Sequence, residues 1–382
     1  MPHYKFDQIA FNITDKKMPE PGDEKMYIGL EHLDSGSLKI TRWGSEVELT
    51  GQKLVMKKGD VLFGRRNTYL RRAAIAPHAG IFSAHGMIFR PKTQVIDPEY
   101  FPFFISSNYF MDAAIRISVG SLSPTVNWKT LKELEFDLPS LEEQRKNAAL
   151  LKSINETKEA YQELLIQTDN LVKSQFIEMF GDIENNAKGY PVKCISDFAD
   201  LFAGATPSTK VSAYWENGTI PWMSSGEVHM GKVTSTEKKI SQLGYDKCST
   251  KMVPIHSVVI ALAGQGKTRG TVAITEIDLC TNQSLCAMVT DGTVLSDYLY
   301  HNLRNRYDEI RNMCAIADGR GGLNLKIVGS IKVIVPSIDE QKAFVAFANQ
   351  SDKSKFELKE AIKSCDALMK AILFTNLEEK EG

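Results

Sequence analysis

The 382-residue sequence lacks the short motifs that mark several classes of enzyme. None of its 14 prolines precedes another proline, so the Asp/Asn-Pro-Pro-aromatic motif of adenine methyltransferases is absent. No proline precedes an aspartate, which removes the usual carboxylate signature of nucleases. The 7 histidines show no metal-ligand spacing, so we interpret them as ordinary surface or core residues. We therefore expect a protein with no catalytic site and no bound metal of its own.

Cysteines and long apolar runs are also scarce. The 6 cysteines all lie in the second half of the chain, without CxxC spacing, which predicts reduced thiols rather than a disulfide framework or a zinc site. No apolar run approaches the ~20 residues that span a bilayer, and the first residues lack the apolar core of a signal peptide. The sequence therefore predicts a cytoplasmic protein with no membrane attachment.

Two long stretches contain neither proline nor glycine, residues 140–180 and 337–377. Each follows a Pro-Ser start and carries acidic residues in its first turn, which suits the positive end of a helix dipole. Both stretches are therefore predicted to be long helices. The first is expected to stop at Gly181, because glycine commonly ends a helix.

The segments that lead into these helices are copies of one another. The eight residues from Leu138 (LPSLEEQR) return at Val335 (VPSIDEQK), an offset of 197 positions (335 − 138). Extended back to Val126 and Leu323, the match runs for twenty positions without a gap. Six of these positions are identical, and in the first copy they are Asn127, Lys129, Pro139, Ser140, Glu143 and Gln144. The sequence therefore predicts an internal duplication.

The duplication divides the chain into four predicted parts. They are a first domain at residues 1–138, a central long helix at 139–183, a second domain at 184–335 and a C-terminal long helix at 336–382. Both domains are predicted to be strand-rich and mixed, since short apolar runs alternate with glycine and aspartate turns. Helices are expected near residues 101–118 and 298–311, and a strand at 127–138. The predicted fold class is α+β, with two domains separated by two long helices.

The two long helices carry the same apolar stripe. Apolar or small residues recur at steps of four and three, at Leu150, Ile154, Thr157, Tyr161, Leu164, Thr168 and Leu171, and at Phe347, Ser351, Ser354, Leu358, Ala361, Cys365 and Leu368. This spacing is that of a coiled-coil seam, so each helix is expected to cover the other. Since the second helix must return toward the first domain, the pair is predicted to be antiparallel with pseudo-two-fold symmetry. The alternative is two unrelated amphipathic surface helices, which the shared offset disfavours.

Positive charge is concentrated in one segment of the first domain. Residues 53–92 hold nine Lys or Arg and one acid, a net +8, while the whole chain is −1 and the remainder is therefore −9. Within this segment the candidate DNA contacts are Arg65, Arg66, Asn67, Tyr69, Arg71 and Arg72. Guanidinium groups pair with phosphate or guanine, and an Asn side chain can pair with adenine. The alternative is a solvated strand edge that carries charge against aggregation.

A glycine-rich loop occupies the corresponding place in the second domain. It runs over residues 264–270 (GQGKTRG), whose glycines would let the backbone approach DNA phosphate. The pattern also satisfies a relaxed phosphate-binding loop, so a P-loop ATPase is the alternative function. Such a loop needs a helix directly after it, yet the following residues TVAI are strand-like. We therefore predict a strand–turn–strand rather than a nucleotide site.

Apolar residues also gather near the ends of the two long helices, outside the predicted seam. They are Phe176, Ile177, Phe180 and Phe374. Exposed apolar clusters commonly mark surfaces that bind a partner. These four residues are therefore predicted to form a partner-binding surface.

Together, these features resemble the specificity subunit of type I restriction-modification systems. The resemblance rests on residues 27–34 (YIGLEHLD), residues 59–66 (GDVLFGRR), the glycine-rich loop and the twin Pro-Ser-x-x-Glu-Gln helix starts, and it covers nearly the whole chain. It implies two target-recognition domains held apart by conserved helices, each reading half of a split duplex DNA target through one of the two loops. In the second loop the implied DNA contacts are Gln265, Lys267, Thr268 and Arg269.

The resemblance also implies partners. Two methylation subunits would carry S-adenosylmethionine, and restriction subunits would use ATP and Mg²⁺, so this chain would have no catalytic activity and no cofactor. A scaffold that binds only protein is a further alternative, which the arginine-rich segment disfavours. The bases of the DNA target cannot be predicted, because unrelated loops read unrelated sequences.

Overall fold

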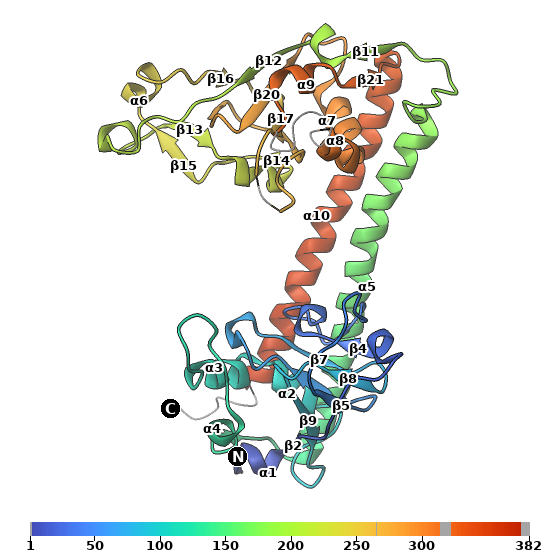
Figure 1. Cartoon of the computed structure of the whole chain (residues 1–382), viewed down its shortest axis with the longest axis vertical. Coiled ribbons are helices and arrows are strands. Elements are labelled where there is room, and N and C mark those ends of the chain that lie inside the picture. The colour runs from blue at the N-terminus through green and yellow to red at the C-terminus, as the bar shows by residue number, and fades with distance from the viewer. Residues whose placement is uncertain (1, 265, 314–321, 376–382) are drawn as a thin grey trace. The chain divides into compact units, whose positions relative to one another are not determined.

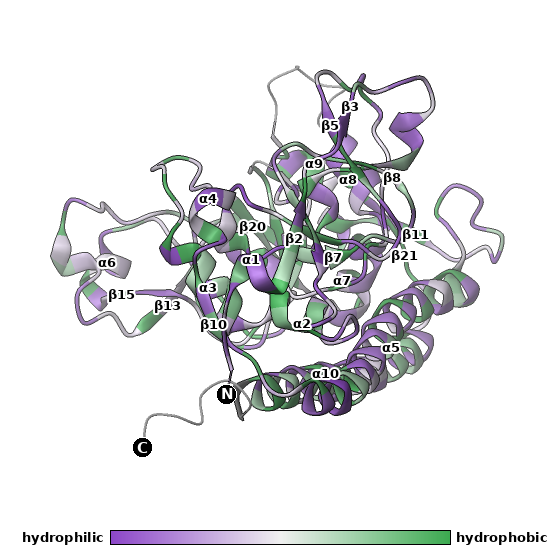
Figure 2. Cartoon of the chain, turned by 90° about the horizontal axis from the view of Figure 1, so that it is seen from below, coloured by the Kyte–Doolittle hydropathy of each residue, from purple (hydrophilic) through white to green (hydrophobic). Residues whose placement is uncertain are grey.

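The computed structural model describes residues 2–264, 266–313 and 322–375 of the chain (Figure 1). The chain forms two compact units, Met1–Glu163 with Leu358–Gly382, and Leu164–Glu357. Each unit contains one strand-rich domain and about half of each long helix, α5 (Leu141–Phe180) and α10 (Ile338–Thr375). Figure 2 shows polar and apolar residues mixed along both helices, and no helix in the described part of the chain could cross a membrane.

The first unit contains two four-stranded sheets. One has the order β2 (Ala10–Ile13), β9 (Met87–Pro91), β6 (Val61–Phe63) and β7 (Ala73–Ile75), and is antiparallel throughout. The other has the order β3 (Lys16–Lys17), β5 (Lys53–Met56), β8 (Gly80–Phe82) and β4 (Tyr27–Ile28), with β4 parallel to β8. A separate pair joins β1 (His3–Lys5) to β10 (Glu135–Asp137).

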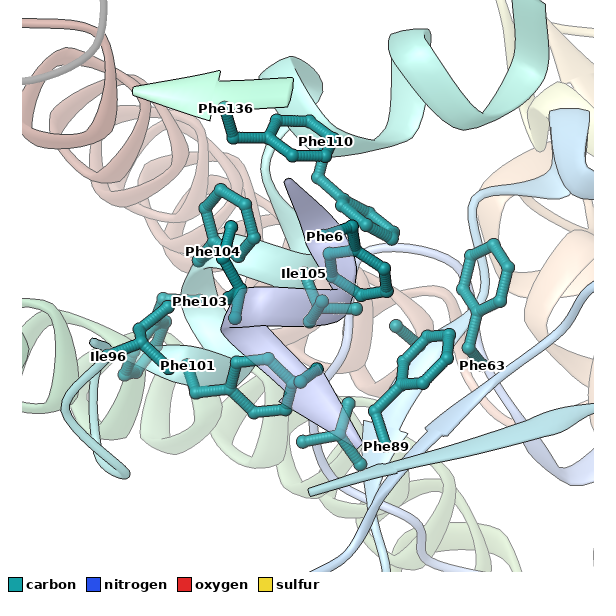
Figure 3. Close-up of a cluster of buried hydrophobic side chains, with 14 of the residues drawn as sticks. Phe6, Phe63, Phe89, Ile96, Phe101, Phe103, Phe104, Ile105, Phe110 and Phe136 are labelled. Atoms are coloured by element: carbon teal, nitrogen blue, oxygen red, sulfur yellow. The ribbon is translucent and has the colours of Figure 1, made fainter. Parts of the chain in front are cut away.

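Aromatic side chains fill the core of this unit (Figure 3). Phe6 of α1 (Phe6–Ile9) lies 5.2 Å from Phe89 and 5.0 Å from Phe110 between ring centroids. Helices α2 (Phe101–Ser106) and α3 (Asn108–Arg116) supply further rings to the same cluster. Leu151 of α5 and Leu373 of α10 belong to it as well, so both long helices are anchored in this core.

The second unit repeats this plan. Its larger sheet has the order β12 (Ala199–Ala203), β20 (Leu285–Thr290), β17 (Val258–Ala261), β18 (Val272–Thr275) and β14 (Lys232–Val233). The smaller has the order β15 (Lys238–Ile240), β13 (Ile220–Met223), β19 (Leu279–Thr281) and β16 (Met252–Val253). A separate pair joins β11 (Val192–Cys194) to β21 (Lys332–Ile334). The first four strands of the larger sheet correspond in order to β2, β9, β6 and β7, which confirms the duplication.

The shorter helices follow the same repeat with two differences from the predictions. The region expected as one helix at 101–118 is two, because Ser107 leaves helical geometry and its hydroxyl accepts the Phe110 N–H at 3.2 Å. Its counterpart is likewise divided into α7 (Ser296–Asn305) and α8 (Tyr307–Asn312). The expected strand at 127–138 begins as helix α4 (Trp128–Leu131), as its counterpart begins as α9 (Leu325–Gly329), and only its end forms β10. A further short helix, α6 (Gln242–Asp246), lies in the second unit.

The repeated Ser and Glu form capping boxes at the two helix starts. The Glu143 carboxylate accepts hydrogen bonds from the Ser140 hydroxyl at 2.8 Å and the Ser140 N–H at 2.9 Å. These two bonds hold the pKa of Glu143 below its ordinary value. Glu340 accepts the same bonds from Ser337 at 2.6 and 3.0 Å. This arrangement satisfies free donors at each helix N-terminus.

The repeated Gln fastens each helix to its domain. Buried Gln144 donates through Nε2 to the carbonyls of Val95 and Pro139, and its Oε1 accepts the Asp97 N–H at 2.7 Å. Gln341 makes the equivalent three bonds, to the carbonyls of Thr293 and Pro336 and from the Leu295 N–H. Four of the identical residues (Pro139, Ser140, Glu143 and Gln144) thus act together to start a helix and fix its direction.

Within each unit, α5 and α10 pack side by side (Figure 1). In the first unit buried Lys158 pairs with Asp366 at 2.7 Å, and in the second Asp169 pairs with Lys355 at 3.0 Å. Within the second unit, Phe176 comes after Asp169 on α5, and its neighbour Phe344, 5.1 Å away between ring centroids, comes before Lys355 on α10. This order confirms the antiparallel pair. The α5 helix ends at Phe180, and Gly181 follows with φ +75°, as predicted.

The predicted seam on α5 is displaced by one residue. Leu150, Leu164 and Leu171 are 52%, 44% and 53% exposed, whereas Leu151 and Val172 are buried. On α10 the predicted positions Ser351 and Cys365 are buried, but Leu368 is 54% exposed. The two helices therefore pack along a heptad-like seam. On α5 the buried residues come one position after those that the sequence predicted.

Candidate nucleic-acid interface

The arginine-rich loop, residues 64–72, joins β6 to β7 in the first unit. Its base is closed by the Gly64 N–H, which donates to the Arg72 carbonyl at 2.9 Å. The glycine-rich loop, residues 264–270, lies between β17 and β18 in the second unit. Because these strands correspond in the two sheets, the two loops occupy equivalent places.

The backbone of the arginine-rich loop is strained. Asn67 has φ +54° and Arg71 has φ +48°, so both adopt the left-handed conformation. This conformation is uncommon for residues other than glycine, and for a long side chain such as Arg it is unfavourable. A short 3₁₀ turn, Thr68–Leu70, lies between them.

The loop also holds buried polar atoms without partners. Arg65 Nε, Asn67 Oδ1 and Arg72 Nε have no hydrogen-bond partner, and they are three of eight such side-chain atoms in the described chain. A buried polar atom without a partner costs free energy, so its presence needs an explanation. Strain and unmet hydrogen bonds in one loop are typical of a functional site rather than a simple turn.

The structure separates the predicted contacts of this loop into two groups. Arg66 and Tyr69 are exposed, Tyr69 by 56%. Arg71 instead forms an ion pair with Asp112 and donates to Asn108 Oδ1 at 3.1 Å. Arg72 donates to the Leu30 carbonyl at 2.8 Å, and burial lowers its pKa. Arg71 and Arg72 are therefore predicted DNA contacts that already have partners within their own unit.

Other charges of the basic segment also have internal roles. Arg90 makes two hydrogen bonds to buried Asp60, at 2.6 and 2.9 Å. The Lys92 ammonium lies 4.7 Å from the centre of the Phe11 ring. Lys57 and Lys58 are exposed without a carboxylate partner among the described residues, but they lie at the opposite end of β6 from the loop. The positive surface beside the loop is therefore smaller than the sequence charge implies.

The glycine-rich loop connects two antiparallel strands, as predicted. Strand β18 (Val272–Thr275) follows where a phosphate-binding loop would be followed directly by a helix, so the P-loop alternative loses its phosphate-binding geometry. Gly264, Gly266 and Gly270 have φ of +141°, +61° and +83°, values that favour glycine.

The side chains of the glycine-rich loop differ in their surroundings. Lys267 is exposed, and its carbonyl accepts the Tyr307 hydroxyl at 3.1 Å. Thr268 Oγ1 lies 3.2 Å from His229 Nε2, and Arg269 Nε is buried without a partner. The predicted contact Gln265 lies outside the described residues. Among the predicted DNA contacts of this loop, Lys267 is therefore the exposed cation.

The hairpin at residues 119–125 was not predicted, although it pairs with the arginine-rich loop. Asn67 N–H donates to the Pro124 carbonyl at 2.7 Å, and Val126 N–H donates to the Arg65 carbonyl at 2.9 Å. Two features of the sequence could have drawn attention to this hairpin. Gly120 and Pro124 are typical turn residues, and residues 113–132 around them contain no Asp or Glu.

The predicted partner surface is wrong for two of its four residues. Phe176 and Phe180 are 5% and 0% exposed and belong to the core of the second unit. Ile177 is 50% exposed, as expected for an outward position. The side chain of Phe374 lies outside the described residues.

Neither metal nor thiol chemistry is evident in the described residues. In residues 2–264, 266–313 and 322–375, no group of three or more His, Cys, Asp or Glu side chains could hold a metal ion. Burial raises the pKa of the Cys280 thiol to about 11 and that of Cys286 to about 12, which disfavours the reactive thiolate.

Known proteins resemble the chain along most of its length. Residues 11–167 and 187–364 match the family model described as the type I restriction modification DNA specificity domain. A type I restriction enzyme specificity subunit from Escherichia coli is 28% identical over 163 residues, 42% of this chain and 40% of the relative. One from Methanocaldococcus jannaschii is 29% identical over 128 residues, 33% of this chain and 29% of the relative. The alignments thus span less than half the length of either relative.

A solved structure shares the fold. The S subunit of a type I restriction-modification system from M. genitalium is 14% identical, with a TM-score of 0.58 over 99% of this chain and 96% of that chain. At this identity the likeness shows the fold alone. The family model, however, matches both halves of the duplication, and each match contains one strained or glycine-rich loop between equivalent strands. The chain therefore belongs to the family of type I restriction modification DNA specificity domains.

Proposed function

We propose that this chain is the DNA specificity subunit of a type I restriction-modification complex. Each unit would read one half of a bipartite, asymmetric duplex target through the loop between its equivalent strands. The observation that carries the proposal is the arginine-rich loop, where left-handed backbone and buried unpaired polar atoms coincide beside exposed Arg66 and Tyr69. Such a loop is poised for contacts that its own domain does not supply.

The same proposal assigns the chemistry to other subunits. Two methylation subunits would bring S-adenosylmethionine, and restriction subunits would bring ATP and Mg²⁺, in a cytoplasmic complex. The chain itself would bind DNA and assemble these partners without catalysis. The exposure of Ile177 supports its place in the predicted partner surface, where it would meet such a subunit.

The two kinds of arginine in the loop give a direct test. Arg66→Ala is expected to weaken DNA binding and to reduce the slope of log affinity against log salt by about one, because one phosphate contact is lost. Arg72→Ala is expected instead to lower the free energy of unfolding by about 1–3 kcal/mol, because the Leu30 carbonyl loses its donor. Filter binding over a salt series, with the chain assembled with methylation subunits, measures the first effect, and thermal unfolding measures the second.

Lys58→Ala is the matched control, since this exposed cation lies at the other end of β6. It should change the salt slope less than Arg66→Ala does. Equal slopes and affinities for wild type and Arg66→Ala would remove this loop from the DNA interface.

A further inference from the structure

The hairpin at residues 119–125 is a defined element rather than a loose connection. Val119 and Thr125 exchange two backbone hydrogen bonds, at 3.1 and 2.9 Å. Gly120 has φ +111°, and a side chain there would approach the Ser123 carbonyl at 3.4 Å, so the tight turn favours glycine. Directly after the hairpin, Val126 is fully buried in the core of the first unit. The position of the hairpin tip is therefore fixed by these backbone hydrogen bonds and by the buried side chain of Val126.

This hairpin and the arginine-rich loop form one joined surface. Besides the two backbone bonds described above, Arg66 forms a β-bridge with Thr125, and its guanidinium donates to Ser123 Oγ at 3.2 Å. The position of Arg66 is thus set by the hairpin as well as by its own loop. A ligand that meets Arg66 must also meet the hairpin tip.

The tip of the hairpin presents an apolar side chain to solvent. Leu122 is 95% exposed, and Val119 at the base is 61% exposed. Exposing an apolar Leu side chain to water is unfavourable, so a ligand that covers Leu122 would gain free energy of binding. Ser121 and Ser123 flank Leu122, so its apolar side chain projects between two hydroxyl groups. Tyr69 and Leu70 of the neighbouring loop are exposed as well.

The charge around Leu122 favours nucleic acid as the ligand. Residues 113–132 and residues 61–96 contain no Asp or Glu, so neither partner in the joined surface brings an acid of its own. An apolar side chain between serines and beside an arginine fits a DNA groove, where hydroxyl and guanidinium groups meet phosphates and an apolar group meets a base.

We infer that Leu122 is a specificity-determining residue that contacts bases directly in the first half of the DNA target. The inference rests on the proposed function and adds to it a second reading element, next to the arginine-rich loop.

The test compares wild type, Leu122→Ser, Leu122→Ala and the control Val47→Ser, each as the full chain assembled with methylation subunits. Val47 is 73% exposed in the same unit but belongs to neither loop, so it controls for the loss of an exposed apolar side chain. Methylation mapping in cells gives the recognised sequence, and binding to a synthetic duplex of that sequence gives the affinity. A second duplex with deoxyuridine in place of thymine in the first half tests for contact with a thymine methyl group.

We expect Leu122→Ser to bind the original duplex roughly 5- to 100-fold more weakly, the range for losing one base contact. Its methylated motif should be relaxed at one or two positions of the first half, with the second half unchanged. Leu122→Ala should be intermediate, and Val47→Ser should match wild type. Deoxyuridine should weaken wild type and leave Leu122→Ser unaffected if the base contacted is thymine, whereas relaxation without that effect would place Leu122 on another base.

An unchanged motif together with unchanged affinity would overturn the inference. So would loss of methylation subunits from the purified complex with the motif unchanged, because Leu122 would then contact protein. A wild-type complex that selects no sequence would instead contradict the proposed function itself. The failure of the inference and the failure of the proposed function are therefore distinguishable.

Discussion

Phe180→Ala is expected to lower the free energy of unfolding of the second unit by about 3–5 kcal/mol, the usual cost of emptying a buried aromatic site. The Phe180 ring is fully buried and packs against Phe176, Tyr298 and Phe344, with centroid distances of 5.0, 5.1 and 5.7 Å. Because these rings come from α5, α7 and α10, the substitution should loosen the attachment of both long helices to the domain.

Ile177→Ala is the matched control, three residues away on the exposed side of α5. Since half of the Ile177 side chain is already in contact with water, its loss should cost less than about 1 kcal/mol. Hydrogen exchange on the full chain, resolved by segment, measures the stability of the second unit separately from the first. Similar losses for the two substitutions would contradict the packing described for α5.

Acidification is expected to destabilise the second unit through His301. Burial lowers the pKa of His301 to about 4, although nearby Asp352 acts in the opposite direction and Arg304 and Lys355 act with burial. The unfolded chain, with an ordinary pKa near 6.5, therefore binds a proton at a higher pH than the folded chain does. The stability due to neutral His301 is complete above pH ~6.5 and is lost as the pH falls toward 4, by about 3 kcal/mol at 1.4 kcal/mol per pH unit.

His301→Phe should remove this part of the pH dependence. Chemical denaturation of wild type and variant at pH values between 4 and 7 gives the difference in slope, so the titration of carboxylates common to both cancels. His301 lies 5.3 Å from the Phe344 ring, and an aromatic replacement suits that neighbour. Parallel stability curves for the two proteins would show that His301 is not held neutral by the fold.

The sequence predicted the helix starts well because their signals are local. Ser140, Glu143 and Gln144 act within one turn of helix, and their copies act in the same way at Ser337. Gly181 correctly predicted the end of α5, and the strand-like residues after the glycine-rich loop correctly predicted β18. At these positions the backbone geometry depends on the residues themselves. The duplicated α+β fold followed from these repeated signals.

The register of the seam could not be predicted from the stripe alone. Leu150 is followed by Leu151, Leu164 by Leu165, and Leu171 by Val172, so two neighbouring edges of α5 have almost equal apolar character. The choice between them depends on the core of each domain, which takes Leu151 in the first unit and Val172 in the second. The same domain packing buries Phe176 and Phe180, which the helix pattern placed at an outer surface.

Charge in the candidate site was overestimated for a related reason. A sequence shows how many arginines a segment holds but not which of them meet carboxylates or carbonyls far along the chain. Arg71 reaches Asp112, Arg72 reaches the Leu30 carbonyl, and Arg90 reaches Asp60. The hairpin that joins Arg66 was missed because its pairing with the loop links residues more than fifty positions apart.

Methylation mapping of a host with and without this chain tests the central claim most directly. If the chain selects a target through two domains, deleting it should abolish methylation at one motif made of two short half-sites with an unspecified gap. Restoring the wild-type chain should restore that motif. A host methylome that does not change when the chain is removed would contradict the assignment of DNA specificity to this protein.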